Sequence, residues 1–405
     1  MRRLLIVGTA DTKAEEIGFL HGVLAPHLAP HLAPHLAGLT TVDLGSGPPG
    51  RAMDVSAAEI AACHPHGAGF LAGRDRGTVV AAMGQAFAAW CALNGGTIAG
   101  VIGVGGGGGT AMVTAGMRQL PLGVPKVMVS TLASGDVAAY VDISDILMVP
   151  AITDLAGLNR ISRMVLHNAA MALRGMVEHP PVPDAAGRQA VGLTMFGVTT
   201  PCVTAIAAAL QARFDPLIFH ATGTGGRAME AFAAQGLLAG FLDITTTEIA
   251  DLLCGGVLAC LPSRLDVVAQ SLLPWVGSVG ALDMVNFQAP ATVPERFRDR
   301  LFYHHNPNVT LMRTTAAENT LIGHWIAEKL NVCAGPVRLL IPENGFSALD
   351  IAGGPFHDPA ADQALILALR DRLRETENRR IIALPLHIND PEFAAVAAET
   401  FLNLT

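Results

Sequence analysis

A regular alternation of segments constrains the fold of this chain more than any other feature. Short runs rich in Val, Ile and Leu recur, and each is followed by a turn rich in Gly or Thr and then by an Ala-rich stretch. The predicted strands are 3–8, 100–104, 126–130, 191–196, 217–220 and 337–341. Near-continuous apolar strands that alternate with helices are typical of parallel sheets covered on both faces. The sequence therefore predicts an α/β fold built from doubly wound parallel sheets.

A proline cluster divides the chain into two predicted domains. The 405 residues exceed the length of one typical domain. Apolar residues at three- and four-residue spacing predict an amphipathic helix that begins at Asp154 and reaches Met176. The prolines at 180, 181 and 183 cannot continue a helix, and they predict a linker that runs on to Gly187. We expect domains at residues 1–183 and 184–405, with the boundary near residues 180–188.

The two predicted domains resemble each other. Each opens with a strand and a Thr-rich turn, at residues 8–13 and 197–201. Each later carries a strand, a glycine loop and an Ala-Met pair at the start of a helix, at residues 111–112 and 228–229. The pattern favours duplication of one α/β unit.

Composition and charge exclude several classes of protein. With 51% hydrophobic residues and a mean hydropathy of +0.43, the chain can bury sizeable cores. No apolar run approaches the roughly 18 residues of a membrane helix or makes a signal-peptide core, so we expect a cytoplasmic protein without a membrane partner. A formal net charge of −8 without a basic stripe argues against nucleic acid. The 6 cysteines contain no Cys-x-x-Cys pair, and we expect them to be reduced and mostly buried.

A glycine run is the strongest local signal for function. Residues 105–109 are all glycine, directly after an apolar strand and before a predicted helix. Such a turn presents backbone N–H groups where no Cβ blocks an approaching anion. Each ordered glycine costs roughly 0.5–1 kcal/mol relative to alanine, so some function should offset the cost. The turn predicts a phosphate site, with close packing of the loop against a neighbouring strand as the alternative.

A second loop supports the same prediction. Residues 8–13 follow the first strand, and Asp11 or Thr12 suits the N-cap of the next helix. A lysine at a helix N-terminus opposes the macrodipole unless an anion is bound there, so Lys13 is a candidate phosphate ligand or else an exposed first-turn lysine. The P-loop pattern Gly-x-x-x-x-Gly-Lys-Ser/Thr is absent from the sequence, so P-loop hydrolysis does not follow.

The second half offers a rival site. Residues 223–228 satisfy Gly-x-Gly-x-x-Ala, and Asp243 follows Gly223 at the distance where a dinucleotide fold places its ribose-binding acid. This pattern predicts NAD(P) binding as an alternative function.

Polar residues also gather in predicted loops of the second half, where they could form a second cleft for a small-molecule substrate. Helix caps and interdomain hydrogen bonds explain them equally well. They are Thr199, Thr200, His220, Thr245 to Glu248, Asp283, Asn286, His304, His305, Asn306, Arg313, His387, Asn389 and Asp390.

One low-complexity segment stands apart. Ala-Pro-His-Leu occurs three times between Ala25 and Leu36. His27, His31 and His35 could bind a metal, but a slipped repeat that lengthens a surface loop explains the segment as well. We predict no metal site of the protein's own.

Longer strings point to a known family. They lie at 8–13, 125–131, 194–202, 220–223, 280–287 and 387–390, in order along essentially the whole chain. Through them the sequence resembles the UPF0261 family and is similar to the Tm-1-like ATP-binding domain. The resemblance implies two Rossmann-like subdomains, ATP binding in the first, with Mg²⁺, and self-association. The nucleotide contacts that it implies are Asp11, Thr12, Lys13, Ser46, Arg76, Gly106, Gly107, Gly108 and Gly109.

The chain departs from that family in places. The family typically has Ser in the glycine loop where this chain has Gly107, which removes a hydroxyl that could meet phosphate or magnesium. The TIM-barrel-like domain that follows in the plant relative is not part of this sequence, so inhibition of viral replication is not expected. The hypotheses are an ATP-binding protein that is either an ATP-dependent enzyme or a nucleotide-regulated interaction module, and an NAD(P)-dependent enzyme. The sequence identifies no catalytic residue.

Overall fold

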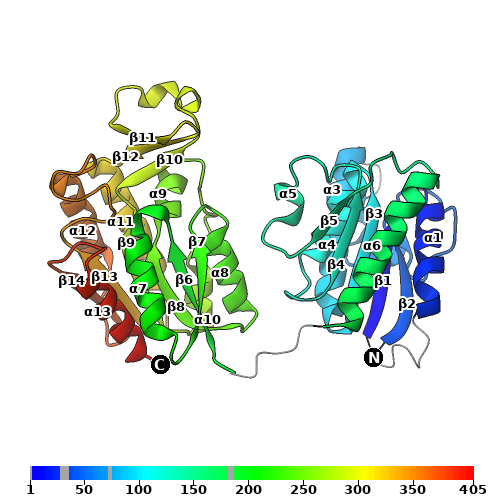
Figure 1. Cartoon of the computed structure of the whole chain (residues 1–405), viewed down its shortest axis with the longest axis horizontal. Helices are drawn as coiled ribbons and strands as arrows, with labels where there is room; N and C mark the ends of the chain where they lie inside the picture. Colours follow the sequence, from blue (N-terminus) through cyan, green and yellow to red (C-terminus); the bar gives the residue numbers. More distant parts are fainter. Residues whose placement is uncertain (1, 28–35, 72–74, 181–186) are drawn as a thin grey trace. The chain divides into compact units, whose positions relative to one another are not determined.

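The computed structural model describes residues 2–27, 36–71, 75–180 and 187–405. The chain divides into two compact units, Met1–Pro183 and Asp184–Thr405 (Figure 1). Each unit contains a parallel sheet flanked by helices, which confirms the predicted α/β class with two Rossmann-like folds.

Unit 1 is built on a five-stranded parallel sheet in the order β2-β1-β3-β4-β5. Alternate residues of β1 face opposite sides of the sheet. Leu4 and Ile6 join the core beneath α1 and α6, whereas Leu5 and Val7 join the core beneath α3 and α4. The strands are β1 (Arg2–Gly8), β2 (Leu36–Asp43), β3 (Ile98–Gly105), β4 (Lys126–Ser130) and β5 (Leu147–Pro150). The helices are α1 (Ala14–Leu24), α2 (Ala57–Ala61), α3 (Arg76–Asn94), α4 (Gly107–Met117), α5 (Ala138–Val141) and α6 (Arg160–Glu178).

Unit 2 is built on a six-stranded parallel sheet in the order β14-β13-β9-β8-β6-β7. Helices α7 and α13 pack on one face, and α8 to α12 gather around the other core. The strands are β6 (Ala190–Met195), β7 (Asp215–His220), β8 (Leu238–Thr245), β9 (Trp275–Gly280), β13 (Val337–Pro342) and β14 (Arg379–Leu384). The helices are α7 (Thr200–Leu210), α8 (Gly225–Ala234), α9 (Thr247–Cys254), α10 (Asp266–Ser271), α11 (Ala316–Asn331), α12 (Pro359–Arg372) and α13 (Pro391–Leu402).

The two sheets share one strand order. Counted within each unit, the second strand pairs with the first, and the third, fourth and fifth follow on the other side of the first. This strand order is the flavodoxin-like one, which is one of the common orders of doubly wound sheets. In such sheets, ligands bind at the carboxyl ends of the first and third strands. In unit 1 those strands are β1 and β3, and in unit 2 they are β6 and β8.

A small antiparallel sheet in unit 2 was not predicted. Its order is β10-β12-β11, formed by β10 (Met284–Phe287), β11 (Phe302–Asn306) and β12 (Val309–Arg313). It interrupts the alternation of parallel strands and helices between β9 and α11, and Figure 1 shows it at the edge of the unit. Strands this short carry little periodicity of their own.

The predicted helix from Asp154 begins later, at Arg160. Gly157 has φ +85°, which breaks the helix, and Asn159 is the N-cap of a capping box with Ser162. Leu155 is nevertheless buried, so its apolar spacing reflects core packing from a loop. Within the described ranges, no helix is long and apolar enough to cross a membrane. All 6 cysteines are free thiols and five are buried, as predicted.

Candidate functional site

The carboxyl edge of the unit 1 sheet surrounds a cavity of about 1070 Å³. The cavity lies where the loops after β1, β2 and β3 meet, at the point where the strand order reverses. The structure brings every predicted nucleotide contact to this one cavity. They are Asp11, Thr12 and Lys13 after β1, Ser46 after β2, Arg76 at the start of α3, and Gly106 to Gly109 after β3.

The glycine turn opens helix α4 without a side-chain cap. Gly106 is the N-cap residue, and within the part of the chain that the structure describes no side chain accepts from the first turn of the helix. The cavity borders Gly106 to Gly109. Since the first N–H groups of a helix have no partner within it, this turn offers donors and the positive end of the α4 dipole to a ligand in the cavity.

Packing explains only part of the glycine run. A Cβ at Gly105 would lie 2.9 Å from the backbone of Gly109, so only glycine fits there. A Cβ at Gly106 would lie 3.7 Å from Thr131 Oγ1, and one at Gly107 would lie 3.6 Å from a Leu132 methyl group. Both are ordinary contact distances, and none of residues 105–109 has a positive φ. Close packing, the alternative to phosphate binding, therefore accounts for Gly105 but not for Gly106 or Gly107.

Two carboxylates shape the loops opposite the glycine turn. The buried Asp43 Oδ1 accepts hydrogen bonds from the N–H groups of Ala10 (2.8 Å) and Gly45 (2.7 Å) and so ties the loops after β1 and β2 together. Asp11 Oδ2 accepts from the Gly47 N–H at 3.0 Å. Asp11 Oδ1 is buried and has no hydrogen-bond partner among the described residues. The site thus contains a carboxylate oxygen with spare bonding capacity.

Two basic side chains line the same cavity. Lys13 is half-buried, and its Nζ donates to the backbone oxygen of Leu155 in the loop after β5. Arg76 is exposed on the first turn of α3, where Asp75 is the N-cap. With Asp11 as the sole acidic side chain among the lining residues, the polar half of the cavity suits an anion.

The opposite half of the cavity is apolar, and the sequence analysis did not identify it. Small side chains of α2 and apolar side chains of α3 and α4 form it. No short motif marks these residues, because they belong to three elements that only the fold brings together. They are Ala57, Ala58 and Ala61 of α2, Val79, Val80 and Met83 of α3, and Met112 of α4.

In unit 2, the glycine turn that starts at Gly223 is occupied by the protein itself. The buried Glu248 Oε1 accepts from the N–H groups of Gly223 (2.8 Å) and Gly226 (3.1 Å). A Cβ at Gly225 would overlap the His220 carbonyl oxygen, and Gly223 has φ +84°. The backbone therefore requires glycine at 223 and 225, and the N–H groups of Gly223 and Gly226 already have a carboxylate partner.

The Asp243 carboxylate is also occupied by hydrogen bonds from within unit 2. Its carboxylate is fully buried and receives two hydrogen bonds from Arg264 Nη2, at 2.7 and 2.8 Å. Trp275 Nε1 donates to it at 3.2 Å. Glu230 and Glu248 complete an ion-pair network around the same guanidinium. The geometry of this loop does not support the NAD(P) alternative, because the amides of Gly223 and Gly226 and the carboxylate of Asp243 already have partners within unit 2.

The polar residues predicted to form a second cleft fall into separate groups. Thr199 and Thr245 share a buried hydrogen bond of 2.8 Å between their hydroxyls, next to Thr246 and Thr247. The Asn286 side chain donates a hydrogen bond to Asp251. Asn389 caps the first turn of α7, which begins at Thr200, by accepting a hydrogen bond from the Cys202 N–H. The ring Nε2 of His387 forms a hydrogen bond with the backbone oxygen of Ser347. The backbone N–H of His387 donates to the Asp390 carboxylate. His220, His304, His305 and Asn306 are exposed. These contacts are a helix cap and hydrogen bonds within unit 2. The cap agrees with the alternative explanation, whereas the bonds are not the interdomain bonds that it included.

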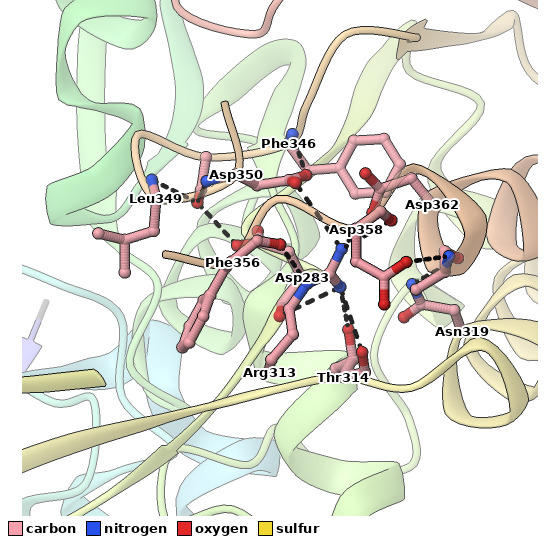
Figure 2. Close-up of polar contacts among 12 residues, drawn as sticks. Asp283, Arg313, Thr314, Asn319, Phe346, Leu349, Asp350, Phe356, Asp358 and Asp362 are labelled. Carbon is pink, nitrogen blue, oxygen red and sulfur yellow. Dashed lines mark hydrogen bonds and ion pairs between the residues drawn. The ribbon is translucent and has the colours of Figure 1, made fainter. Parts of the chain in front are cut away.

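Asp283 and Arg313 belong to a buried cluster that Figure 2 shows. Arg313 Nη2 donates to Asp362 Oδ1 at 2.6 Å and lies 3.7 Å from Asp350 Oδ1. Asp283 Oδ2 accepts from the Ser347 hydroxyl at 2.7 Å. Burial, followed by the neighbouring Asp350 charge, raises the pKa of Asp283 to about 7 and that of Asp362 to about 8. In this low-dielectric interior, Asp283 and Asp362 hold their protons more strongly than exposed aspartates do, and the cluster around Arg313 is a structural network.

Among the described residues, no group of three His, Cys, Asp or Glu side chains is arranged to hold a metal ion. His27 ends a short 3-10 turn (Ala25–His27), whereas His31 and His35 lie outside the described residues.

Comparison with known proteins places the chain in a family. Residues 2–181 match the Uncharacterised protein family (UPF0261) N-terminal domain, and residues 188–405 match its C-terminal domain. The chain belongs to the UPF0261 family. It is 58% identical to a UPF0261 protein of Rhizobium meliloti (strain 1021), over 100% of this chain and 99% of the relative. A UPF0261 protein of Clostridium tetani is 40% identical, over 100% and 99%.

The chain described here, like its bacterial relatives a UPF0261 protein, is also 40% identical to the ToMV resistance protein Tm-1 of Solanum lycopersicum. That similarity covers 100% of this chain and 56% of the tomato protein. The family resemblance inferred from the sequence is thus confirmed.

Proposed function

We propose that unit 1 binds ATP, with the phosphates on the glycine turn after β3 and the base in the apolar half of the cavity. The observation that carries the proposal is the turn at Gly106, which no described side chain caps and where neither packing nor backbone conformation requires glycine. Lys13 and Arg76 border the same cavity and supply charge-assisted contacts to phosphate oxygens.

The shape of the cavity supports a nucleotide over inorganic phosphate. A volume of about 1070 Å³ is far larger than one phosphate group needs. The small Ala57, Ala58 and Ala61 side chains of α2 line it together with Val79, Val80 and Met83 of α3. An apolar wall that adjoins an amide-rich anion site suits a heterocyclic base joined to a phosphate tail.

The residues also fit a divalent cation that accompanies the nucleotide. Mg²⁺ is usually held by one or two carboxylates together with substrate phosphates, and it neutralises phosphate charge. Asp11 Oδ1 is a buried carboxylate oxygen without a partner beside the anion site. Beside phosphates this carboxylate would be repelled unless a cation lay between them, so Asp11 is the residue that would hold Mg²⁺.

Isothermal titration of the full chain with ATP and with a non-hydrolysable analogue tests the proposal. We expect saturable binding of both, weakened at least 100-fold in Gly106→Val, where the added side chain blocks the amides. Lys13→Ala should weaken binding about tenfold. Gly96→Val is the matched control, because Gly96 is exposed, has no neighbour within 4 Å and lies away from the cavity. No saturation by either nucleotide in the wild type would end the proposal.

Whether the chain turns ATP over needs a separate measurement. A steady-state ATPase assay distinguishes an ATP-dependent enzyme, whose turnover disappears in Lys13→Ala, from a nucleotide-regulated interaction module that binds without turnover. The cytoplasmic location and the self-association expected from the sequence stay predictions.

A further inference from the structure

A second hollow lies on the other side of the glycine turn. Its volume is about 330 Å³, and it is formed by the loops after β4 and β5. We name it the β4–β5 hollow. The side chains that carry polar groups into it are Thr131, Ser134, Thr153 and Asp154.

The β4–β5 hollow and the nucleotide cavity share a wall. Strands β3 and β4 are paired neighbours, and the Thr131 N–H donates to the Gly105 oxygen at 3.3 Å. A Cβ at Gly106 would lie 3.7 Å from Thr131 Oγ1. The backbone oxygen of Leu155, just beyond Asp154, accepts from Lys13 of the nucleotide cavity. A ligand in the hollow would therefore lie beside the anion site of the glycine turn.

A strained residue supports a role for the hollow beyond packing. Ile152 has φ +67°, and the Thr153 N–H donates to the Ala151 oxygen at 2.7 Å, which is the pattern of a γ-turn. The left-handed region is a genuine outlier for a β-branched residue. Burial does not explain the strain, because 77% of Ile152 is exposed. Strain of this kind persists where the surroundings fix a functional conformation.

The lining chemistry defines the ligand. Thr131 and Ser134 carry hydroxyls that make no hydrogen bond to any described residue, and Thr153 Oγ1 accepts only a 3.3 Å bond from Asn159. Asp154 adds a carboxylate, and the described residues that line the hollow include no lysine or arginine. Hydroxyls and a carboxylate pair well with the hydroxyls of a ligand, whereas a second anion would meet Asp154 without a compensating cation.

We propose that the β4–β5 hollow binds a neutral polyhydroxylated compound of about monosaccharide size. Its position beside the phosphate end of a nucleotide rests on the proposed function of unit 1, but the hollow and its chemistry do not.

Saturation-transfer NMR on the full chain tests the proposal with xylitol, D-ribose and D-glucose as neutral probes, and with gluconate and glucose 6-phosphate as charged ones. We expect saturable signals from at least one neutral probe and weaker or absent signals from both charged ones. Asp154→Asn and Thr131→Val should each weaken the neutral signal at least fivefold. Asp136→Asn should leave it unchanged, because Asp136 also accepts one nearby backbone N–H, as Asp154 does, but does not line the hollow.

Ile152→Gly provides a second, independent variant. Glycine adopts the left-handed conformation without strain, so the melting temperature should stay the same or rise while probe binding weakens at least threefold. A lower melting temperature with unchanged binding would mean that Ile152 serves only the structure.

Three results would overturn the proposal: no saturable neutral probe, tighter binding of the charged probes, or equal effects of Asp154→Asn and Asp136→Asn. An ATP titration on the same samples separates the two sites. Neutral binding without ATP binding would end the nucleotide proposal alone, and ATP binding without any neutral binding would end this one alone.

Discussion

The two glycine turns of this chain are similar in sequence and opposite in state. In unit 1, the N–H groups at the start of α4 border an open cavity, and none of the described side chains caps the helix. In unit 2, the N–H groups of Gly223 and Gly226 are bound by the buried Glu248. The donors of the first turn lie at a cavity, and those of the second turn are satisfied by a side chain of the same unit.

Strand order shows that the two turns are not equivalents. The unit 1 turn follows β3, the third strand, whereas the Gly223 turn follows β7, the second strand of unit 2. The position in unit 2 that corresponds to Gly106 is the start of α9 after β8, where Thr246, Thr247 and Glu248 stand. The shared strand order fits duplication of one unit, but the matching Ala-Met pairs do not correspond. The comparison teaches that a glycine run indicates a ligand site only where its amides remain unoccupied.

Gly225→Ala is the most severe test of the crowded turn. The added Cβ would overlap the carbonyl oxygen of His220, and only a shift of the backbone could relieve the contact. We expect a loss of about 4 kcal/mol or more in the free energy of unfolding, at the exceptional end for one substitution. Chemical denaturation measures the loss, and hydrogen exchange should locate it in unit 2. Unfolding identical to that of the wild type would show that packing does not hold this turn.

Removing the Glu248 carboxylate should lower the free energy of unfolding slightly less than Gly225→Ala does. Glu248→Ala leaves the amides of Gly223 and Gly226 unpaired and takes one carboxylate from Arg264. We expect destabilisation of unit 2 by about 3 kcal/mol, since unsatisfied buried groups cost about 1–3 kcal/mol each. Glu248→Gln, which keeps an acceptor oxygen, should lose less.

The same variant sharpens the argument against NAD(P). Calorimetry should find no NAD binding in the wild type or in Glu248→Ala, and ATP binding in unit 1 should be unaffected. NAD binding that appears in Glu248→Ala and disappears on further substitution of Asp243 would restore the dinucleotide hypothesis.

The Arg313 cluster predicts a pH dependence confined to unit 2. Burial raises the pKa of Asp283 to about 7 and of Asp362 to about 8. Because both values lie above the ordinary value for aspartate, the folded state binds more protons than the unfolded chain between pH 4 and 8. The stability that these two groups contribute is fully present below about pH 4, decreases as the pH rises from there, and is lost once the pH has passed through 7 and 8.

Hydrogen exchange of unit 2 amides at pH 5.5, 7 and 8.5 measures this fall. Asp283→Asn should flatten the dependence of stability on pH, because the amide does not titrate. The Oδ1 atom that is replaced has no hydrogen-bond partner among the described residues. Stability that rises from pH 5.5 to 8.5 would contradict the assignment of protons to the cluster.

The smallest expected effect concerns Gly107. A methyl group fits at this exposed helical position, 3.6 Å from Leu132, so Gly107→Ala should stabilise unit 1 by about 0.5–1 kcal/mol. Gly22→Ala, in α1 with no neighbour within 4 Å, is the matched control and should gain a similar amount. ATP affinity should change little in either variant, because the family typically has Ser, which is larger than Ala, at position 107. Destabilisation by Gly107→Ala would mean that packing requires this glycine.

Much of the fold followed from local patterns. The predicted strands at 3–8 and 126–130 match β1 and β4 closely, because a strand buried on both faces is apolar at almost every position. The start of α6 could not be placed, since Leu155 is buried from a loop and imitates helical spacing. The antiparallel sheet β10-β12-β11 was not predicted, because strands this short show no distinctive periodicity of apolar and polar residues.

The sequence by itself determined the class of the fold, the division near the prolines and the chemical capacity of each turn. These properties are local, since they depend on the side chains of consecutive residues and on backbone freedom. The tertiary structure decided which turn is open. Glu248 reaches Gly223 from a different helix, and Asp43 joins two loops 33 residues apart. Whether an amide is free or occupied depends on such distant partners, and only the folded chain brings them within hydrogen-bond distance.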